Sequence, residues 1–212
     1  MLLSVTDLGF AYPHRPPVLA DVTFEVPGGS SLAIVGPSGT GKTTLLALLG
    51  GLLLPSSGGA AVVLDDGERR AVGPLASWVL QTVNVLPDRT VADNVALGAY
   101  SSGVGRRAAL ALVEPALAEV GLAGYARRPV RTLSGGEVQR VVIARALVSD
   151  RPVVLADEPT GQLDPRTTTD VASALLAAGR DRIVVIVTHD PAVAALCSHV
   201  LRLDSGHLEA AA

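Results

Sequence analysis

The stretch that most constrains how this chain can fold lies between two apolar runs, 32–35 and 45–49, and consists of Gly36, Pro37, Ser38, Gly39, Thr40, Gly41, Lys42, Thr43 and Thr44. The apolar runs predict a buried strand before this glycine-rich stretch and a helix after it. Glycines let the backbone approach a phosphate chain closely, and the N–H groups at the start of a helix attract its negative charge. Lys42 can then reach the β- and γ-phosphates, and the Thr43 hydroxyl can ligate Mg²⁺. The sequence therefore predicts a binding site for a nucleoside triphosphate.

Composition limits the classes of protein to which the chain can belong. Its 212 residues are 49% hydrophobic, enough to bury one substantial core in one domain or two lobes. The 17 basic and 20 acidic residues give a net charge of −3 without blocks of like charge, so nucleic acid is not expected as a partner. The single cysteine, Cys197, excludes an internal disulfide and is expected to be a small core residue in a reducing compartment.

The sequence shows neither the pattern of a secretion signal nor that of a membrane span. Residues 1–7 lack a basic start and a long apolar core, which predicts that the protein stays in the cytoplasm. Residues 43–64 carry no charge over a spanning length, but the turn residues 55–59 interrupt them. We expect a helix, a turn and a strand there, and no direct insertion into a membrane.

Alternation of strands and helices predicts an α/β fold with a mostly parallel sheet and crossover helices. The predicted strands are 2–10, 18–26, 32–35, 61–64, 71–72, 78–80, 153–156 and 183–187, and the later helices are 91–97, 106–120, 135–149 and 166–178. The first strands form an N-terminal antiparallel β lobe. We expect a single domain over 1–212, in which 1–82 and 150–212 form the nucleotide-binding core with this β lobe and 83–149 form an inserted α-helical lobe.

Two carboxylates follow the predicted buried strand 153–156. Asp157 stands at the carboxyl end of that strand, where an acidic residue beside a phosphate loop can hold Mg²⁺. Glu158 has no obvious partner to neutralise it and would lie where a water molecule attacks the γ-phosphate. These features make Glu158 the candidate general base. The alternative for Glu158 is a solvated acid at a strand end.

A second candidate anion site lies in the stretch Leu133-Ser134-Gly135-Gly136-Glu137-Val138-Gln139-Arg140. Here Ser134, Gly135 and Gly136 offer a hydroxyl and bare backbone N–H groups at the start of a predicted helix. The alternative is a capped helix start with incidental glycines.

This stretch resembles the signature motif of ATP-binding cassette (ABC) proteins. The glycine-rich stretch, Gln81, the signature, Asp157-Glu158, 161–164 and 188–190 stand in the order and approximate spacing of that family's ATPase subunit, over essentially the whole chain. The resemblance implies the ABC ATPase fold, which contains a P-loop NTPase core, and ATP hydrolysis. It also implies that two subunits meet head to tail, so that Ser134 and Gly136 of one cap the ATP held by Lys42 of the other. The second subunit would be a copy of this chain or a paralogous ATPase.

The resemblance assigns roles to four further residues. Tyr12 resembles the aromatic that stacks on adenine, and Gln81 resembles the glutamine that touches Mg²⁺ and the attacking water while linking to the membrane partner. His189 resembles the histidine that contacts the γ-phosphate, and Asp164 resembles the aspartate that bridges the two subunits. A plain turn aromatic is the alternative for Tyr12, a structural histidine is the alternative for His189, and a helix N-cap is a compatible second role for Asp164. The remaining histidines are expected on the surface: His14, His199 and His207.

Residues 81–87 and 158–164 most resemble the ABC subgroup of lipoprotein-release, macrolide-export and cell-division systems. Three departures are Thr82, where an aromatic is frequent in relatives, Gln162, where asparagine is usual, and a short interval from Lys42 to Gln81 that leaves less chain for the β lobe. The implied function is an ATP-hydrolysing subunit of an ABC transporter, working at the cytoplasmic face of separate membrane-spanning permease subunits.

The same ATPase motifs occur in proteins with other roles. The alternative is an ABC ATPase of a mechanotransmission system that regulates an extracytoplasmic enzyme. Chromosome-maintenance and DNA-repair relatives insert a long coiled coil between the glycine loop and the signature, and ribosome-acting relatives carry two cassettes. Neither pattern occurs here.

The segment 81–87 joins the predicted core to the helical lobe. With Val85, Leu86 and the following Val91, it is too apolar for an ordinary exposed loop, and such a patch usually marks a partner surface. We expect a short cytoplasmic helix of the permease to dock there through an apolar face. The alternative places Leu86 in the core of the helical lobe.

Overall fold

The structure is a computed structural model that describes residues 1–81, 84–161 and 163–210. Two of the departures noted in the sequence, at Thr82 and Gln162, lie outside the described residues, as does the predicted boundary between residues 82 and 83.

A mostly parallel sheet forms the centre of the molecule. Its strand order is β10-β9-β3-β8-β7-β6 within the part of the chain that the structure describes. The strands are β3 (Ser31–Val35), β6 (Ala76–Val79), β7 (Val153–Asp157), β8 (Ile183–Val187), β9 (His199–Asp204) and β10 (His207–Ala210). All neighbours pair in parallel except β9 and β10, which form an antiparallel hairpin.

Side chains alternate between the two faces of this sheet, because successive residues of a strand point to opposite sides. In β7, Val153 and Leu155 enter one hydrophobic core, whereas Val154 and Ala156 enter the other. Both cores are apolar, which explains why the central strands read as continuous apolar runs rather than as an alternating pattern.

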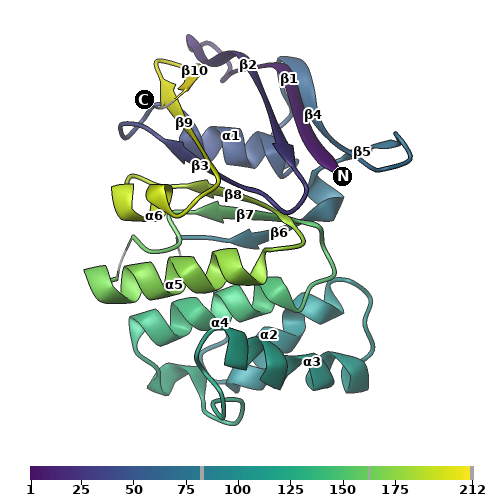
Figure 1. The fold of residues 1–212 in the computed structure, drawn as a ribbon, viewed down its shortest axis with the longest axis vertical. Coiled ribbons are helices and arrows are strands. Elements are labelled where there is room, and N and C mark those ends of the chain that lie inside the picture. The colour runs from purple at the N-terminus through teal and green to yellow at the C-terminus, as the bar shows by residue number, and fades with distance from the viewer. Residues whose placement is uncertain (82–83, 162, 211–212) are drawn as a thin grey trace.

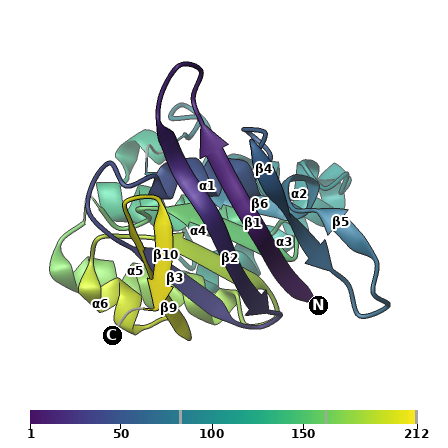
Figure 2. The same ribbon diagram turned by 90° about the horizontal axis from the view of Figure 1, so that it is seen from above.

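An antiparallel sheet covers one of the two cores. Its order is β2-β1-β4-β5, from β1 (Leu2–Ala11), β2 (Pro17–Pro27), β4 (Ser57–Val63) and β5 (Arg69–Ala71). Helix α1 (Lys42–Leu49) lies between this sheet and the central one, and buries Leu45, Leu46 and Leu49 in the shared core. Figure 2 shows β1 and β2 running side by side across this face of the molecule. The predicted β lobe is confirmed.

Helices cover the other face. In Figure 1, α5 (Pro165–Ala178) lies next to the central sheet, α4 (Gly135–Leu147) lies beyond it, and α2 (Val91–Tyr100) and α3 (Arg106–Glu119) lie farthest away. Short helices connect these elements: η1 (Gly73–Leu75), η2 (Val130–Thr132) and α6 (Pro191–Ala195). Among the described helices, none is long and apolar enough to cross a membrane.

The sequence did not predict the last part of the fold. Strands β9 and β10 and helix α6 were not expected, although the two-residue turn Ser205-Gly206 is the kind that closes a hairpin, with positive φ values of 48° and 85°. Val91 was expected in a docking segment, but it is fully buried in the helical core. Cys197 is half-buried against the same core, and burial raises the pKa of its thiol, as a structural cysteine requires.

A partly buried arginine connects the helical lobe to the segment that follows Gln81. Arg145, on α4, donates to the carbonyl oxygens of Asn84 at 2.6 Å and Asn94 at 2.9 Å, and to Oδ1 of Asn94 at 3.1 Å. The fully buried Asn94 side chain in turn accepts from the Leu86 N–H at 2.7 Å and donates to the Leu86 carbonyl at 3.0 Å. Burial lowers the pKa of Arg145. This network therefore fixes the backbone around Leu86 to the helix that starts at the signature.

Candidate active site

The candidate residues meet at the carboxyl edge of the central sheet, the edge at which open α/β sheets bind ligands. The loop after β3 holds the glycine-rich stretch, β7 ends at Asp157, β8 is followed by His189, and β6 is followed by Gln81. Register aligns these strand ends, because Val187 pairs with both Ile34 and Asp157.

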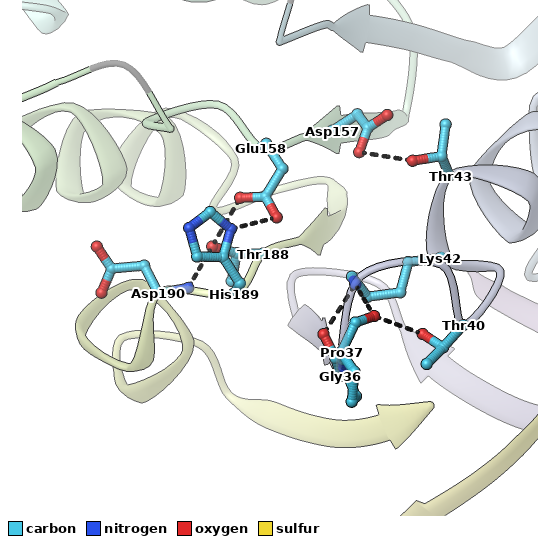
Figure 3. A network of polar contacts seen from close by, with 10 residues as sticks. All are labelled: Gly36, Pro37, Thr40, Lys42, Thr43, Asp157, Glu158, Thr188, His189 and Asp190. Carbon is cyan, nitrogen blue, oxygen red and sulfur yellow. Dashed lines mark hydrogen bonds and ion pairs between the residues drawn. The ribbon is translucent and has the colours of Figure 1, made fainter. Parts of the chain in front are cut away.

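The glycine-rich loop takes a shape that side chains would prevent. Gly36 has φ of 151°, and a Cβ there would overlap the carbonyl oxygen of Leu203 on β9. Gly41 has φ of 102° and precedes α1 without giving it a side-chain cap, so the first N–H groups of the helix remain available to an anion. Lys42 is buried, and its Nζ donates to the carbonyl oxygens of Gly36 and Pro37, each at 2.8 Å (Figure 3). The loop thus gathers main-chain donors and one ammonium group in one place.

A cavity of about 400 Å³ opens beside this loop. Tyr12 stands on its wall with 39% of the residue exposed, and its ring packs edge-on against Phe10 with 4.9 Å between the ring centres. The cavity therefore has an aromatic ring at one side and phosphate-binding groups at the other. Arg15 and Val18 also line the cavity, which no sequence pattern indicated, because only the three-dimensional packing brings them there. The lining residues are Tyr12, Arg15, Pro16, Val18, Gly39, Gly41, Lys42, Thr43 and Thr44.

Asp157 and Thr43 meet next to the loop. The Thr43 hydroxyl donates to Oδ1 of Asp157 over 3.4 Å, as Figure 3 shows. Burial raises the pKa of Asp157, and the charge of Glu158 adds to this effect, whereas the Thr43 hydrogen bond and the charge of Lys42 oppose it. Two oxygen donors of this kind suit Mg²⁺, which commonly takes one or two protein oxygens together with substrate phosphates.

Glu158 has a partner that the sequence did not reveal. The sequence shows no obvious partner for it, whereas in the structure its Oε1 lies 2.7 Å from Nδ1 of His189, across an interval of 31 residues (Figure 3). Its Oε2 accepts from the buried Thr188 hydroxyl at 3.4 Å. The backbone at Glu158 has φ of 45°, a conformation that non-glycine residues seldom adopt, and its N–H donates to Val187 at 2.9 Å. The structure thus brings the two predicted catalytic residues into direct contact.

Gln81 lies on the other side of Glu158. It is exposed and follows β6, and together with Glu158 and Pro159 it lines a cavity of about 210 Å³. Thr43 and Asp157, the other two residues predicted to hold the metal, contact each other outside this cavity. Gln81 therefore lines the same cavity as the predicted base, whereas the other two predicted metal ligands, Thr43 and Asp157, contact each other.

The signature residues form a second polar surface at the start of α4. Ser134 is the N-cap: its Oγ accepts from the Glu137 N–H at 3.3 Å, and its N–H donates to the Glu137 carboxylate at 2.8 Å. That backbone hydrogen bond holds the pKa of Glu137 below its ordinary value. The Ser134 hydroxyl accepts from the helix and also hydrogen-bonds the Glu137 carboxylate, so it would have to leave that carboxylate to donate to an anion.

The two signature glycines have different surroundings. A Cβ on Gly135 would meet nothing within 4 Å, whereas one on Gly136 would lie 2.8 Å from Cγ2 of Thr167. Asp164 stands at the same surface and accepts from the Thr167 N–H at 3.2 Å, so the predicted capping role is confirmed. A cavity of about 300 Å³ lies here, lined by Ser134, Gly135, Gly136, Glu137, Arg140, Leu163, Asp164 and Thr167.

Known proteins resemble this chain in sequence and in fold. The sequence profile described as ABC transporter matches residues 19–161, more than half of the chain. The chain belongs to the ABC transporter family. The lipoprotein-releasing system ATP-binding protein LolD of Oleidesulfovibrio alaskensis is 38% identical, over 98% of this chain and 95% of that protein. The macrolide export ATP-binding/permease protein MacB of Salmonella paratyphi A is 36% identical, over 98% of this chain and 34% of that larger protein.

Solved ABC structures have the same fold. The dimeric bacterial ABC transporter cassette MJ0796 superposes with a TM-score of 0.81 and 28% identity, over 98% of this chain and 96% of that one. The predicted ABC ATPase fold and subgroup resemblance are confirmed, and the chain is an ATP-binding, ATP-hydrolysing subunit of an ABC transporter. Lipoprotein release and macrolide export are transport activities, so these relatives do not favour the mechanotransmission alternative.

The half-buried carboxylate of Asp157 should reduce the stability of the subunit at neutral pH. Since its pKa is raised in the folded state, folding opposes ionisation, and this cost is present above the folded pKa and vanishes below the unfolded value, about 4. Asp157→Asn should therefore raise the melting temperature at neutral pH, without nucleotide or metal, and the gain should disappear as the pH falls to that value. Thermal melts across this range check it, and a lower melting temperature at neutral pH would contradict it.

Proposed function

We propose that this ABC subunit hydrolyses ATP at two composite sites formed by a head-to-tail dimer, either with a copy of itself or with a paralogous ATPase. The observation that carries the proposal is that the phosphate-loop cavity and the signature cavity have no lining residue in common. Each is an anion site built on the first turn of a helix. One subunit therefore offers two half-sites on separate surfaces, and a partner copy is what brings them together. The dimeric cassette MJ0796 is a precedent for such an assembly.

In each composite site, the phosphate loop of one subunit binds the nucleotide. Adenine stacks on Tyr12, the backbone N–H groups of residues 36–44 hold the phosphates, and Lys42 moves from the loop carbonyls to the β- and γ-oxygens. Thr43 and Asp157 hold Mg²⁺, with Gln81 as a further ligand when the site closes. The metal supplies charge neutralisation for the phosphates. Ser134, Gly135 and Gly136 of the partner subunit complete the site, and Asp164 of each subunit lies at the shared surface.

Hydrolysis then uses the pair formed by Glu158 and His189. Glu158 accepts the proton of the water molecule that attacks the γ-phosphate, while Thr188 and His189 hold its carboxylate in place. Since a carboxylate only accepts hydrogen bonds, Nδ1 of His189 donates to Glu158, and in the doubly protonated ring the Nε2–H group donates to the γ-phosphate. The exposed ring of His189 is placed to make that contact.

The subunit works with permease subunits of the kind used in lipoprotein release and macrolide export, at the cytoplasmic face of the membrane. Residues 1–82 and 150–212 act as the nucleotide-binding core, and residues 83–149 act as the helical lobe that carries the signature. The helices of the helical lobe share one hydrophobic core with α5 and one face of the central sheet, so this lobe packs directly on the nucleotide-binding core. Closure of the dimer on two ATP molecules and its reopening after hydrolysis would move the permease.

Glu158→Gln should bind ATP but hydrolyse it about 10²-fold more slowly or worse, because the attacking water loses its base. His189→Ala should do the same. The wild-type subunit alone should be largely monomeric, whereas Glu158→Gln should form a stable dimer only when ATP is present. Nucleotide binding, phosphate release and gel filtration measure these three properties.

The matched control carries a second change, Gly135→Glu, in the Glu158→Gln background. A Cβ at this position meets no atom within 4 Å, and glutamate suits the first turn of a helix, but it places a negative charge against the partner's phosphates. This double variant should bind ATP and remain monomeric. A Glu158→Gln protein that stays monomeric with ATP bound, or near-normal hydrolysis by both Glu158→Gln and His189→Ala, would refute the composite site or the assigned base.

We also propose that the permease docks beside Leu86. This side chain is 45% exposed, which argues against its place in the helical core, and the Arg145 network holds its backbone to α4. A helix docked on Leu86 would therefore act on the same helix that carries the signature.

Leu86→Glu should abolish the stimulation of ATPase activity by the permease while leaving the basal rate and melting temperature nearly intact. Leu112→Glu is the matched control, because Leu112 on α3 is similarly exposed, at 42%, and lies outside the segment. The basal ATPase rate, the permease-stimulated rate and a melting curve, measured on one preparation, check the prediction. Full stimulation of a stable Leu86→Glu protein, or equal losses in both variants, would remove this segment from the interface.

A further inference from the structure

A buried side chain on the signature helix has a donor that nothing in the described structure satisfies. Gln139 is 5% exposed, and its Nε2 has no hydrogen-bond partner among the described residues. Leaving a buried N–H group unpaired costs on the order of 1–3 kcal/mol, and folded proteins rarely tolerate it without a reason. An apolar residue of the same length would avoid that cost, so the amide calls for a function.

Gln139 lines the cavity of about 210 Å³ that also contains Glu158 and Gln81. The first turns of α4 form one wall through Gly135, Val138 and Gln139, and the turn after β7 forms the opposite wall. The cavity therefore separates the signature helix of a subunit from the predicted base of the same subunit. None of its lining residues belongs to the phosphate-loop cavity.

Water fits this cavity by both size and chemistry. One water molecule requires roughly 10–15 Å³ on this scale and two to four polar partners. The space is more than ten times larger, and Gln139, Gln81 and Glu158, which carry amide and carboxylate donors and acceptors, are among its lining residues. Nε2 itself has almost no accessible surface, so a small rotation of the Gln139 amide toward the cavity lets a water there accept from it and donate to the Glu158 carboxylate, which removes the cost of the unpaired N–H.

We propose that Gln139 is a positioning residue for hydrolysis, which holds ordered water between the signature helix and the side chains of Glu158 and Gln81. The inference rests on the proposed role of Glu158 as the base. The held water fixes the orientation of the two side chains that face the attacking water, so Gln139 acts through them and does not touch the nucleotide. A shift of α4 then changes the position of the base in the same subunit, in addition to the contact between the signature and the nucleotide bound by the partner.

Gln139→Met tests this role, because methionine keeps the length and volume of the side chain but removes the amide donor. Its kcat should fall about tenfold, since small errors in the placement of reacting groups are costly. The KM for ATP and the ATP-dependent dimer should not change, because the phosphate-loop cavity is intact. The melting temperature should stay level or rise, since no buried donor is left unpaired. Gln139→Asn keeps the amide, and an additional water can span the missing methylene, so kcat should recover in part.

Val142→Ala is the matched control, because Val142 is buried on the same helix and does not line the cavity. It should lower the melting temperature and leave kcat unchanged where the protein is folded. Wild-type kcat in Gln139→Met, or a lower melting temperature without a change in kcat, would overturn the inference. A high-resolution crystal structure in which a side chain rather than water meets Nε2 would also overturn it.

Glu158→Gln, assayed in parallel, separates this inference from the proposed function. If Glu158→Gln is inactive while Gln139→Met hydrolyses ATP normally, only the role of Gln139 is wrong. If Glu158→Gln is itself active, the assignment of the base is wrong, whatever Gln139→Met does.

Discussion

The shape of the phosphate loop depends on the absence of a side chain at Gly36. A Cβ there would overlap the carbonyl oxygen of Leu203, so the loop can pack against β9 only when residue 36 is glycine. That contact holds the turn between β3 and α1, and with it the direction in which the first N–H groups of α1 point. Lys42, Thr43 and the cavity beside Tyr12 all take their places from this turn. The charged groups around it come from other strands, because parallel pairing brings their carboxyl ends to the same edge.

The parts of the site that are local in sequence could be predicted from sequence. The glycine-rich loop, the capped start of α4 and the acid after β7 each depend on a few neighbouring residues whose conformational preferences act together. The central strands could be predicted for a similar reason: being buried on both faces, they read as uninterrupted apolar runs.

The contacts that join distant segments could not be predicted in this way. The pairing of Glu158 with His189 depends on the register between β7 and β8, which no short pattern encodes. The hairpin of β9 and β10 was missed because its residues are only partly buried and weakly patterned, although the Ser205-Gly206 turn was a usable signal. The unpaired amide of Gln139 is visible only once the walls of its cavity are in place.

The two polar networks of α4 explain how one helix can serve several partners. At its first turn, Ser134 and Glu137 satisfy each other and leave donors that face outward. At its last turn, Arg145 holds the backbone of the segment that carries Leu86. A rigid helix between these ends can relate a docked permease to the partner's nucleotide, since a displacement at one end moves the other. In the proposed dimer with the proposed docking, coupling would therefore pass through the helical lobe.

A mixing assay of two inactive variants, Lys42→Ala and Gly135→Glu, tests the head-to-tail shared site most directly. The first lacks a working phosphate loop, and the second lacks a working signature but should keep its own fold, because a Cβ at Gly135 meets no atom within 4 Å. If sites are shared head to tail, each mixed dimer contains one site with both halves intact, and an equal mixture should recover about a quarter of wild-type ATPase activity by counting mixed dimers and sites. A mixture of folded variants as inactive as its components would contradict the shared site.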